Sequence, residues 1–161
     1  MLLLHLLEDK ELNMLTKLLP DQISKFWPII KYAVEESLPP NIGDHPDKMN
    51  RILSACLSGK LEVWISYKRP DNKFEAVLVT QFLYDDASNV KNLLLYCVYG
   101  YTVIDSGSWT EGFKAMWRYA KANKCQSIIA YSANPNIVEL AKQYGGNTDY
   151  TFITIHLNET V

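Results

Sequence analysis

Residues 57–67 read Leu57-Ser58-Gly59-Lys60-Leu61-Glu62-Val63-Trp64-Ile65-Ser66-Tyr67, and within them the spacing of apolar residues changes from helical to strand-like. Before Gly59, apolar residues from Met49 to Leu57 recur at intervals of three and four, which predicts a helix that begins at Asp44 or His45. Gly59 suits the end of this helix, because glycine adopts the left-handed conformation of a C-terminal cap at little cost. From Leu61 to Tyr67 the alternation has a period of two, which predicts a strand.

Two more strands are predicted immediately downstream. They cover residues 74–83 and 93–99, and turn-forming residues at 69–72 and 85–89 separate the three strands. The strand over 93–99 is apolar on both faces, which places it in the centre of a sheet. The segment as a whole is predicted to be an antiparallel meander.

Helices and single strands are predicted on both sides of the meander. Upstream, apolar spacing predicts a helix over 22–37 with Asp21 as its N-cap. Pro28 is expected to kink this helix or to move its start toward Trp27. Downstream, a helix is predicted to begin at Ser108 or Thr110 and another to cover 136–144. Short strands at 15–19, 127–131 and 150–157 complete the order β-α-α-β-β-β-α-β-α-β.

The composition is that of a single globular domain. The chain has 161 residues, of which 48% are hydrophobic and 21% charged, and its formal net charge is -2. The main basic concentration is Lys114, Arg118, Lys121 and Lys124. Its helical spacing predicts a solvated helix face, so no nucleic-acid partner is expected.

The cysteines and the first residues point to a cytoplasmic protein without a membrane span. Cys56, Cys97 and Cys125 are far apart and odd in number, which argues against a disulfide framework and for a reducing compartment. The leucine-rich start at 2–7 is too short to cross a bilayer. It also lacks the basic flank of a signal peptide.

Four segments resemble GNAT-like proteins of phages and prophages, members of the GCN5-related N-acetyltransferase superfamily. They are 18–23 (Leu-Leu-Pro-Asp-Gln-Ile), 27–30 (Trp-Pro-Ile-Ile), 57–64 as quoted above and 116–125 (Met-Trp-Arg-Tyr-Ala-Lys-Ala-Asn-Lys-Cys). The resemblance covers roughly residues 14–157 and implies an α/β (α+β) domain with a mixed central sheet of about six to seven strands and four helices. It also implies an N-terminal extension over 1–13, a single GNAT-like domain over 14–161, and a bacteriophage protein in the host cytoplasm or the virion.

The resemblance implies an acyl donor and a place to hold it. GNAT enzymes transfer an acyl group from acyl-CoA to an amine, so acetyl-CoA and an amine acceptor are the expected ligands. The pantetheine arm of the donor pairs with the fourth strand of the family, which splays from the fifth. The resemblance therefore implies that Tyr96 and Val98, in the corresponding strand, bind the cofactor. The tyrosines at 96, 99 and 101 either line an acyl groove or pack the sheet.

In GNAT enzymes the diphosphate of the donor lies at the start of the third helix, where unpaired N–H groups attract anions. The usual Arg/Gln-x-x-Gly-x-Gly/Ala signature is missing from residues 100–112. The resemblance assigns Ser106, Gly107 and Ser108 to this site, whereas Asp105 and Glu111 would repel phosphate. The alternative is a plain turn followed by a capped helix, so acetyl-CoA binding is either retained or lost.

A second family motif is an Asn followed by a Tyr and then Gly-Phe. Asn134 matches the Asn and is a cofactor-binding candidate, although it can equally cap the next helix. Ala141 stands at the Tyr position and Gly146 at the Phe position, so the usual general acid is absent. Tyr144, about one turn away, is the candidate substitute.

A base is needed to deprotonate the amine, and Glu75 is the candidate. Asp85 and Asp86 at the end of the same strand are further carboxylates, and each of the three can instead be a solvated strand-end charge. The histidines at 5, 45 and 156 have no metal-site spacing, so no metal is expected.

Two hypotheses therefore remain at this point. One is an acyl-CoA-dependent N-acetyltransferase, with a cofactor site that is either functional or degenerate. The other is a non-catalytic phage protein of GNAT fold that acts in virion assembly or host interaction. In that case the leucine-rich segment 2–19 would dock a protein partner, because exposed apolar stripes mark such sites.

Overall fold

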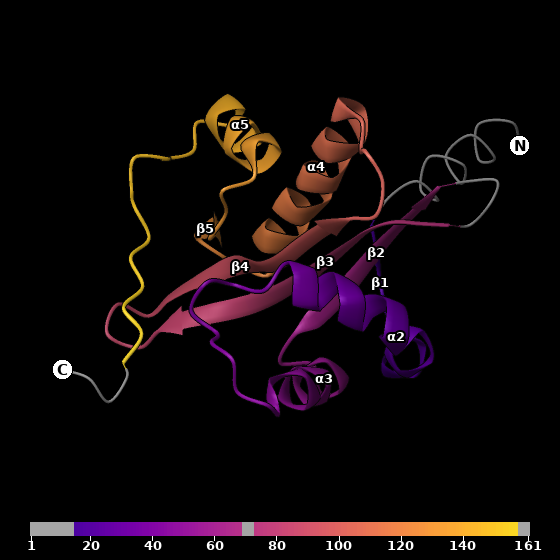
Figure 1. Ribbon diagram of the computed structural model, residues 1–161. Helices are drawn as coiled ribbons and strands as arrows, with labels where there is room; N and C mark the ends of the chain where they lie inside the picture. Colours follow the sequence, from indigo (N-terminus) through magenta and orange to yellow (C-terminus); the bar gives the residue numbers. More distant parts are fainter. Residues whose placement is uncertain (1–14, 69–72, 158–161) are drawn as a thin grey trace, which may run out of the picture.

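A computed structural model describes residues 15–68 and 73–157 of the chain. A five-stranded sheet in the order β1-β2-β3-β4-β5 separates two pairs of helices, with α2 and α3 on one face and α4 and α5 on the other (Figure 1). The elements in chain order are β1 (Thr16–Lys17), α2 (Pro20–Glu36), α3 (Lys48–Ser58), β2 (Glu62–Lys68), β3 (Lys73–Asp85), β4 (Val90–Gly100), α4 (Ser106–Ala122), β5 (Ser127–Ala130) and α5 (Pro135–Gln143). Strands β1 to β4 are antiparallel neighbours, and β5 pairs parallel to β4.

The order of elements follows the prediction as far as α5, but the sheet has five strands within the described residues rather than six to seven. The predicted strand over 150–157 is wrong, because this segment pairs with no strand there. Alternating apolar residues give strand propensity, but a strand forms only when its backbone pairs with another strand, and this segment is unpaired in the described part of the chain. The expected extension over 1–13 and the turn at 69–72 lie outside the described residues.

The helices begin earlier or later than the sequence predicts. Helix α2 begins at Pro20 and runs through Pro28, so its N-cap is Leu19 and not Asp21. The Leu19 backbone N–H donates to Gln22 Oε1 at 2.8 Å. Proline removes one backbone hydrogen bond of the helix. Buried residues on both sides of Pro28, among them Ile23 and Ile30, pack into the core and so stabilise the helix despite this loss.

Helices α3 and α4 also begin away from their predicted first residues. Helix α3 has Asp47 as its N-cap, three residues after the earliest predicted start, and ends at Gly59, whose φ of 81° confirms the predicted left-handed cap. Helix α4 begins at Ser106, with Asp105 as its N-cap. Among the described residues, no helix combines the length and the apolar character needed to cross a membrane.

Each face of the sheet has its own apolar core. The period of two in the strands sends Val63 and Ile65 of β2 toward α2 and α3, where they are almost fully buried. Trp64 points to the opposite face, and its Nε1 donates to Thr80 Oγ1 at 3.0 Å. The core under α4 consists of the buried residues Trp64, Leu78, Leu93, Met116 and Ala120.

Leu93 tests the smaller of these two cores, because its side chain is fully buried beneath α4. We expect Leu93→Ala to lower the free energy of unfolding by ~2–5 kcal/mol, since it removes apolar contacts and leaves a cavity. Denaturant titration followed by circular dichroism measures the change. Val103→Ala is the control: Val103 is 97% exposed, so its loss should stay within about 0.5 kcal/mol. Equal effects of the two substitutions would contradict the assignment of this core.

Candidate functional site

The sheet opens between β4 and β5. These strands are paired only from Asn92–Ser127 to Leu95–Ala130, while β4 continues to Gly100 paired with β3 alone. At the same place β4 contains an extra residue: Leu95 lies opposite Thr80 and Cys97 opposite Val79 of β3, which leaves Tyr96 as a bulge. A bulge bends its strand and strengthens the local twist. The departure of β4 from β5 therefore begins where the bulge lies.

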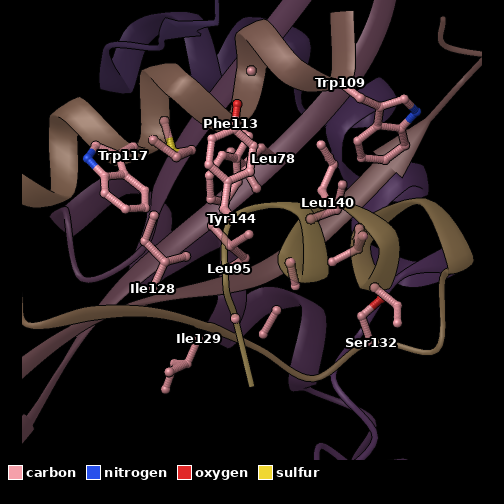
Figure 2. Close-up of a pocket in the computed structure, with 18 of the residues that line it drawn as sticks. Leu78, Leu95, Trp109, Phe113, Trp117, Ile128, Ile129, Ser132, Leu140 and Tyr144 are labelled. Atoms are coloured by element: carbon pink, nitrogen blue, oxygen red, sulfur yellow. The ribbon is translucent and has the colours of Figure 1, made fainter. Parts of the chain in front are cut away.

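A cavity of about 760 Å³ lies over this opening, between the sheet and the helices α4 and α5. Figure 2 shows its walls, in which apolar and aromatic side chains from both helices face the side chains of the sheet. They include Leu78 of β3, Leu95 of β4, Phe113 and Trp117 of α4 and Leu140 of α5. Pockets of this size that are mostly apolar, with a few polar groups, are typical of small-molecule sites.

Glu75 is the acidic side chain that lines this cavity among the described residues. It lies on a second bulge, because Ser66 pairs with Ala76 and Tyr67 with Phe74, so that Glu75 is the extra residue of β3. It is only 7% exposed, and its Oε2 accepts a hydrogen bond from Ser66 Oγ at 3.2 Å. Glu75 is therefore not the solvated strand-end charge of the alternative interpretation.

The other carboxylates considered as bases lie elsewhere. Asp85 and Asp86 are exposed at the turn between β3 and β4, outside the cavity. Asp85 accepts hydrogen bonds from the hydroxyl of Ser88 at 2.5 Å and from its backbone N–H at 3.1 Å. These bonds lower the pKa of the Asp85 carboxyl. Its evident role is to close the turn.

The N-terminus of α4 carries a carboxylate of its own. Asp105 accepts the backbone N–H of Ser108 at 2.8 Å through Oδ1 and the Ser108 hydroxyl at 3.2 Å through Oδ2. Ser108 lines the cavity, whereas Ser106 and Gly107 are not among its lining residues. A negative side chain here interacts favourably with the helix dipole, as a bound anion would. The capped helix of the alternative interpretation is thus what the structure has at this position.

Asn134 and Tyr144 lie at the two ends of α5. Asn134 is the N-cap, and its Oδ1 accepts the backbone N–H of Asn136 at 2.9 Å. Tyr144 follows the last turn and lines the cavity, with its ring 4.5 Å from that of Phe113. The predicted acid is therefore in the cavity wall, whereas Asn134 acts in helix capping.

Gly146, at the position of the family's Phe, has no room for a side chain. A Cβ built there would lie 2.8 Å from the backbone oxygen of Ala141, closer than real Cβ contacts. The same oxygen accepts the Gly146 N–H at 2.7 Å. The departure from the family motif is thus built into the turn after α5.

The side chains of Tyr96 and Tyr99 in β4, and of Tyr101 directly after it, face away from the cavity. Tyr96, Tyr99 and Tyr101 pack against the core under α2, and the Tyr101 hydroxyl donates to the Ile29 backbone oxygen at 2.7 Å. Burial raises the pKa of Tyr96 and of Tyr101 to about 12. Val98 is the β4 candidate whose side chain lines the cavity. Tyr96 has only its backbone near the opening.

A buried polar cluster was not predicted. Glu62 of β2 is 7% exposed, and its Oε2 contacts Lys17 Nζ at 2.5 Å and accepts the Tyr119 hydroxyl. Burial, followed by this hydrogen bond, raises the pKa of Tyr119. Within the described part of the chain, Glu62 Oε1 has no hydrogen-bond partner. The alternation in β2 places Glu62 on the face opposite to Val63, and no pattern in the sequence indicates that α4 covers that second face.

Of the candidate residues, the structure brings Glu75, Val98, Ser108 and Tyr144 together around one cavity. Tyr96, Ser106, Gly107 and Asn134 are not part of its lining. The aromatic wall from α4 was not predicted, although Phe113 and Trp117 lie four residues apart in the helix that the sequence predicts there. The described residues contain no group of acidic, His and Cys side chains that could hold a metal ion.

Comparison with solved structures identifies the fold. A probable acetyltransferase is 9% identical, with 91% of this chain and 98% of that chain covered and a TM-score of 0.64. A predicted acetyltransferase from Clostridium acetobutylicum, solved with acetyl-CoA, is 16% identical, with 88% of this chain and 94% of that chain covered and a TM-score of 0.62. A ribosomal-protein-alanine N-acetyltransferase from Brucella melitensis biovar Abortus 2308 is 10% identical over 89% and 99%, with a TM-score of 0.60.

This chain has the GNAT acetyltransferase fold. No protein-family model and no curated protein matches its sequence. The GNAT fold predicted from the sequence is confirmed over about nine tenths of the chain, although sequence identity is at most 16% in these comparisons. Identities this low establish the fold alone, because one fold can serve many functions.

Substitutions at Asp105 separate its two physical contributions in this GNAT fold. Asp105→Ala removes the acceptor for the Ser108 N–H and should lower the free energy of unfolding by ~0.5–2 kcal/mol. Asp105→Ser keeps a capping oxygen without the charge. It should lower the free energy of unfolding by only about a few tenths of a kcal/mol, because Ser and Asp are similarly good N-caps. Thermal and denaturant unfolding measure both. Equal losses for the two variants would show that the charge, and not the cap, is what stabilises α4.

Proposed function

We propose that this protein is an acyl-CoA-dependent N-acyltransferase in which Glu75 receives the proton of the acceptor amine. The observation that carries the proposal is the buried Glu75 carboxylate at the apolar cavity where β4 leaves β5. Burying a carboxylate in apolar surroundings costs folding free energy, which hydrogen bonds only partly offset. Buried acidic side chains of this kind are therefore more common at functional sites than elsewhere. The fold shared with acetyltransferases supports the same reaction class.

The site fits one part of an acyl-CoA better than another. Beyond Leu95 no described strand lies on the β5 side of β4, so backbone groups of this edge can pair with an amide-containing arm. The apolar walls suit an acyl group and the chain that carries it. A diphosphate at the first turn of α4 would instead meet the Asp105 carboxylate, which already accepts the Ser108 N–H. The donor would therefore be held mainly by the strand edge and the cavity.

Glu75 can do the proton transfer that the reaction requires. An amine attacks a thioester through its lone pair, so an acceptor that arrives as an ammonium must first give a proton to a base. Ser66 Oγ orients the Glu75 carboxylate for this role. The C–N bond then forms and the C–S bond breaks. The nitrogen loses one further proton as the thiolate takes one up, so the net transfer in this step is from nitrogen to sulfur. Tyr144, which also lines the cavity, is the candidate donor of the proton to sulfur.

Calorimetric titration with acetyl-CoA tests donor binding. We expect saturable binding and, at a hundred times the Kd, a thermal stabilisation worth about 2.7 kcal/mol. Asp105→Ser should tighten binding by up to roughly fivefold, because it removes a repulsion of about 1 kcal/mol at the helix terminus. Absence of binding by both proteins would contradict the proposal.

Glu75→Gln tests the base. The amide keeps the size of the side chain and an acceptor for Ser66 but cannot take a proton, so turnover should fall by roughly 10²–10⁴-fold with little change in donor affinity. Release of free thiol from acetyl-CoA, with peptide, amino-sugar and lysine amines as acceptors, measures turnover. Asp85→Asn is the matched control, since that carboxylate is exposed at a turn outside the cavity. Equal rates for Glu75→Gln and the unsubstituted protein would exclude Glu75 as the base.

Two observations favour a second candidate function, that of a non-catalytic phage protein in virion assembly or host interaction. The α4 N-terminus is capped by the chain's own carboxylate, and the family's donor signature is missing from residues 100–112. A GNAT fold that no longer binds an acyl donor would serve as a scaffold. Failure of acetyl-CoA to bind the Asp105→Ser variant as well would favour this role over the acyltransferase.

A further inference from the structure

A small pocket of about 250 Å³ adjoins the large cavity where the later turns of α4 meet the end of α5. Three aromatic and two cationic side chains line it: Phe113, Lys114, Trp117 and Arg118 of α4, and Tyr144 directly after α5. The three aromatic residues also line the large cavity, and Figure 2 shows their side chains next to one another. The small pocket and the large cavity therefore share one wall.

The helical repeat of α4 arranges these side chains in two rows. Phe113 and Trp117 are four residues apart, so their side chains lie in one row along the helix. Lys114 and Arg118 form a second row beside it, and both rows border the small pocket. Residues 114–124 contain four Lys or Arg and no Asp or Glu, although the whole chain has a formal net charge of -2. Positive charge is thus concentrated beside the aromatic row.

The three rings contact one another and remain partly open to solvent. The Tyr144 centroid lies 4.5 Å from that of Phe113 and 6.2 Å from that of Trp117. Their planes are inclined by 36° and 42°, so the rings form a tilted wall rather than a closed stack. Trp117 is 42% exposed and Tyr144 38%. Aromatic faces that stay in water beside a hollow are available to a flat ligand.

The cations beside these rings are free to turn toward an anion. Lys114 Nζ lies 3.7 Å from Glu111 Oε1, but both side chains are about half exposed, and such surface pairs contribute little. Arg118 is exposed and forms no ion pair with another described residue. Lys121 Nζ lies 5.6 Å from the centroid of Trp117, so a third cation borders the same ring.

We propose that the small pocket binds a nucleoside phosphate. The base would lie against the rings of Trp117 and Tyr144, because every base offers a π-face to an aromatic side chain. The phosphate would be held by Lys114 and Arg118, whose N–H groups form charge-assisted hydrogen bonds with phosphate oxygens. Rings alone would take an apolar ligand and cations alone a bare anion, whereas the two rows together select a ligand with both parts. The proposal does not depend on the acyltransferase activity.

Two sources can supply this chemistry: a free nucleotide, or the nucleotide end of an acyl-CoA whose arm lies in the adjoining cavity. The second source would take its phosphates away from the N-terminus of α4. With a rise of about 1.5 Å per residue, Lys114 and Arg118 lie roughly 14 and 20 Å along the helix from Asp105. Exposed charges separated by more than about 8 Å are largely screened at physiological ionic strength, so Asp105 would not oppose binding here.

Calorimetric titration of the full chain with ADP tests the small pocket. We expect saturable binding that Lys114→Gln/Arg118→Gln weakens by roughly tenfold or more, because one charge-assisted hydrogen bond commonly contributes that much. This variant should fold normally, since both positions are exposed. Lys25→Gln/Lys31→Gln is the matched control: it removes the same charge from exposed positions of α2, on the other face of the sheet. Its affinity for ADP should stay within about twofold, because distant exposed charges are screened.

Indole fluorescence locates the base. ADP should quench the emission of the unsubstituted protein, and Trp117→Phe should abolish the quench while calorimetric binding persists, since Phe still offers a ring. Trp109→Phe, in the wall of the large cavity, should leave the quench intact. Absence of binding at millimolar ADP would overturn the proposal. So would a quench that survives Trp117→Phe, or equal weakening by the two double Gln variants.

Competition separates the two sources of the nucleotide. Displacement of ADP by coenzyme A, but not by pantetheine, would assign the small pocket to the nucleotide end of the acyl donor. Unchanged ADP affinity in protein saturated with coenzyme A would assign it to a free nucleotide. ADP binding without any acyl transfer would contradict the acyltransferase and support this proposal, whereas acyl transfer without ADP binding would do the reverse.

Discussion

The extra residue Tyr96 in β4 is the constraint on which the site depends. Before it, Leu93 and Leu95 face α4, and after it Val98 faces α4 as well. Side chains alternate with a period of two, so without the extra residue Val98 would point to the α2 face. The bulge keeps both halves of the strand under α4 while the strand turns away from β5. An apolar floor and an opened sheet are thus two consequences of one irregularity.

Glu75 shows the same device used for a polar side chain. As the extra residue of β3 it escapes the alternation that sends Val77 into the core under α2, and it reaches the cavity beside Ser66. Two bulges therefore bracket the part of the sheet that forms the cavity floor. Bulges are enriched beside active sites because they redirect a side chain at little cost to the rest of the ladder.

The N-terminus of α4 illustrates a competition between stability and binding. Asp105 satisfies the Ser108 N–H and complements the helix dipole, which stabilises α4 in the absence of any ligand. The same carboxylate occupies the place where an anionic ligand would gain from these interactions. The N-terminus of α4 is therefore stable without a ligand and binds a diphosphate less favourably. An acyl donor would have to be bound mainly by the strand edge and the cavity walls.

The sequence by itself determined the local structure: the meander from Leu61 to Tyr99, the left-handed cap at Gly59, and the apolar faces of the helices. These features follow from the short-range spacing of apolar residues. The resemblance of segments such as 116–125 to GNAT-like proteins indicated how the elements are arranged in the fold. Only the tertiary structure decided that Glu75 is buried, that Tyr96 and Tyr99 of β4 face α2, and that residues 153–157 stay unpaired. A bulge reverses the direction of every later side chain in a strand, and a strand forms only where a neighbouring edge receives it, so both depend on contacts between segments that lie far apart in the chain.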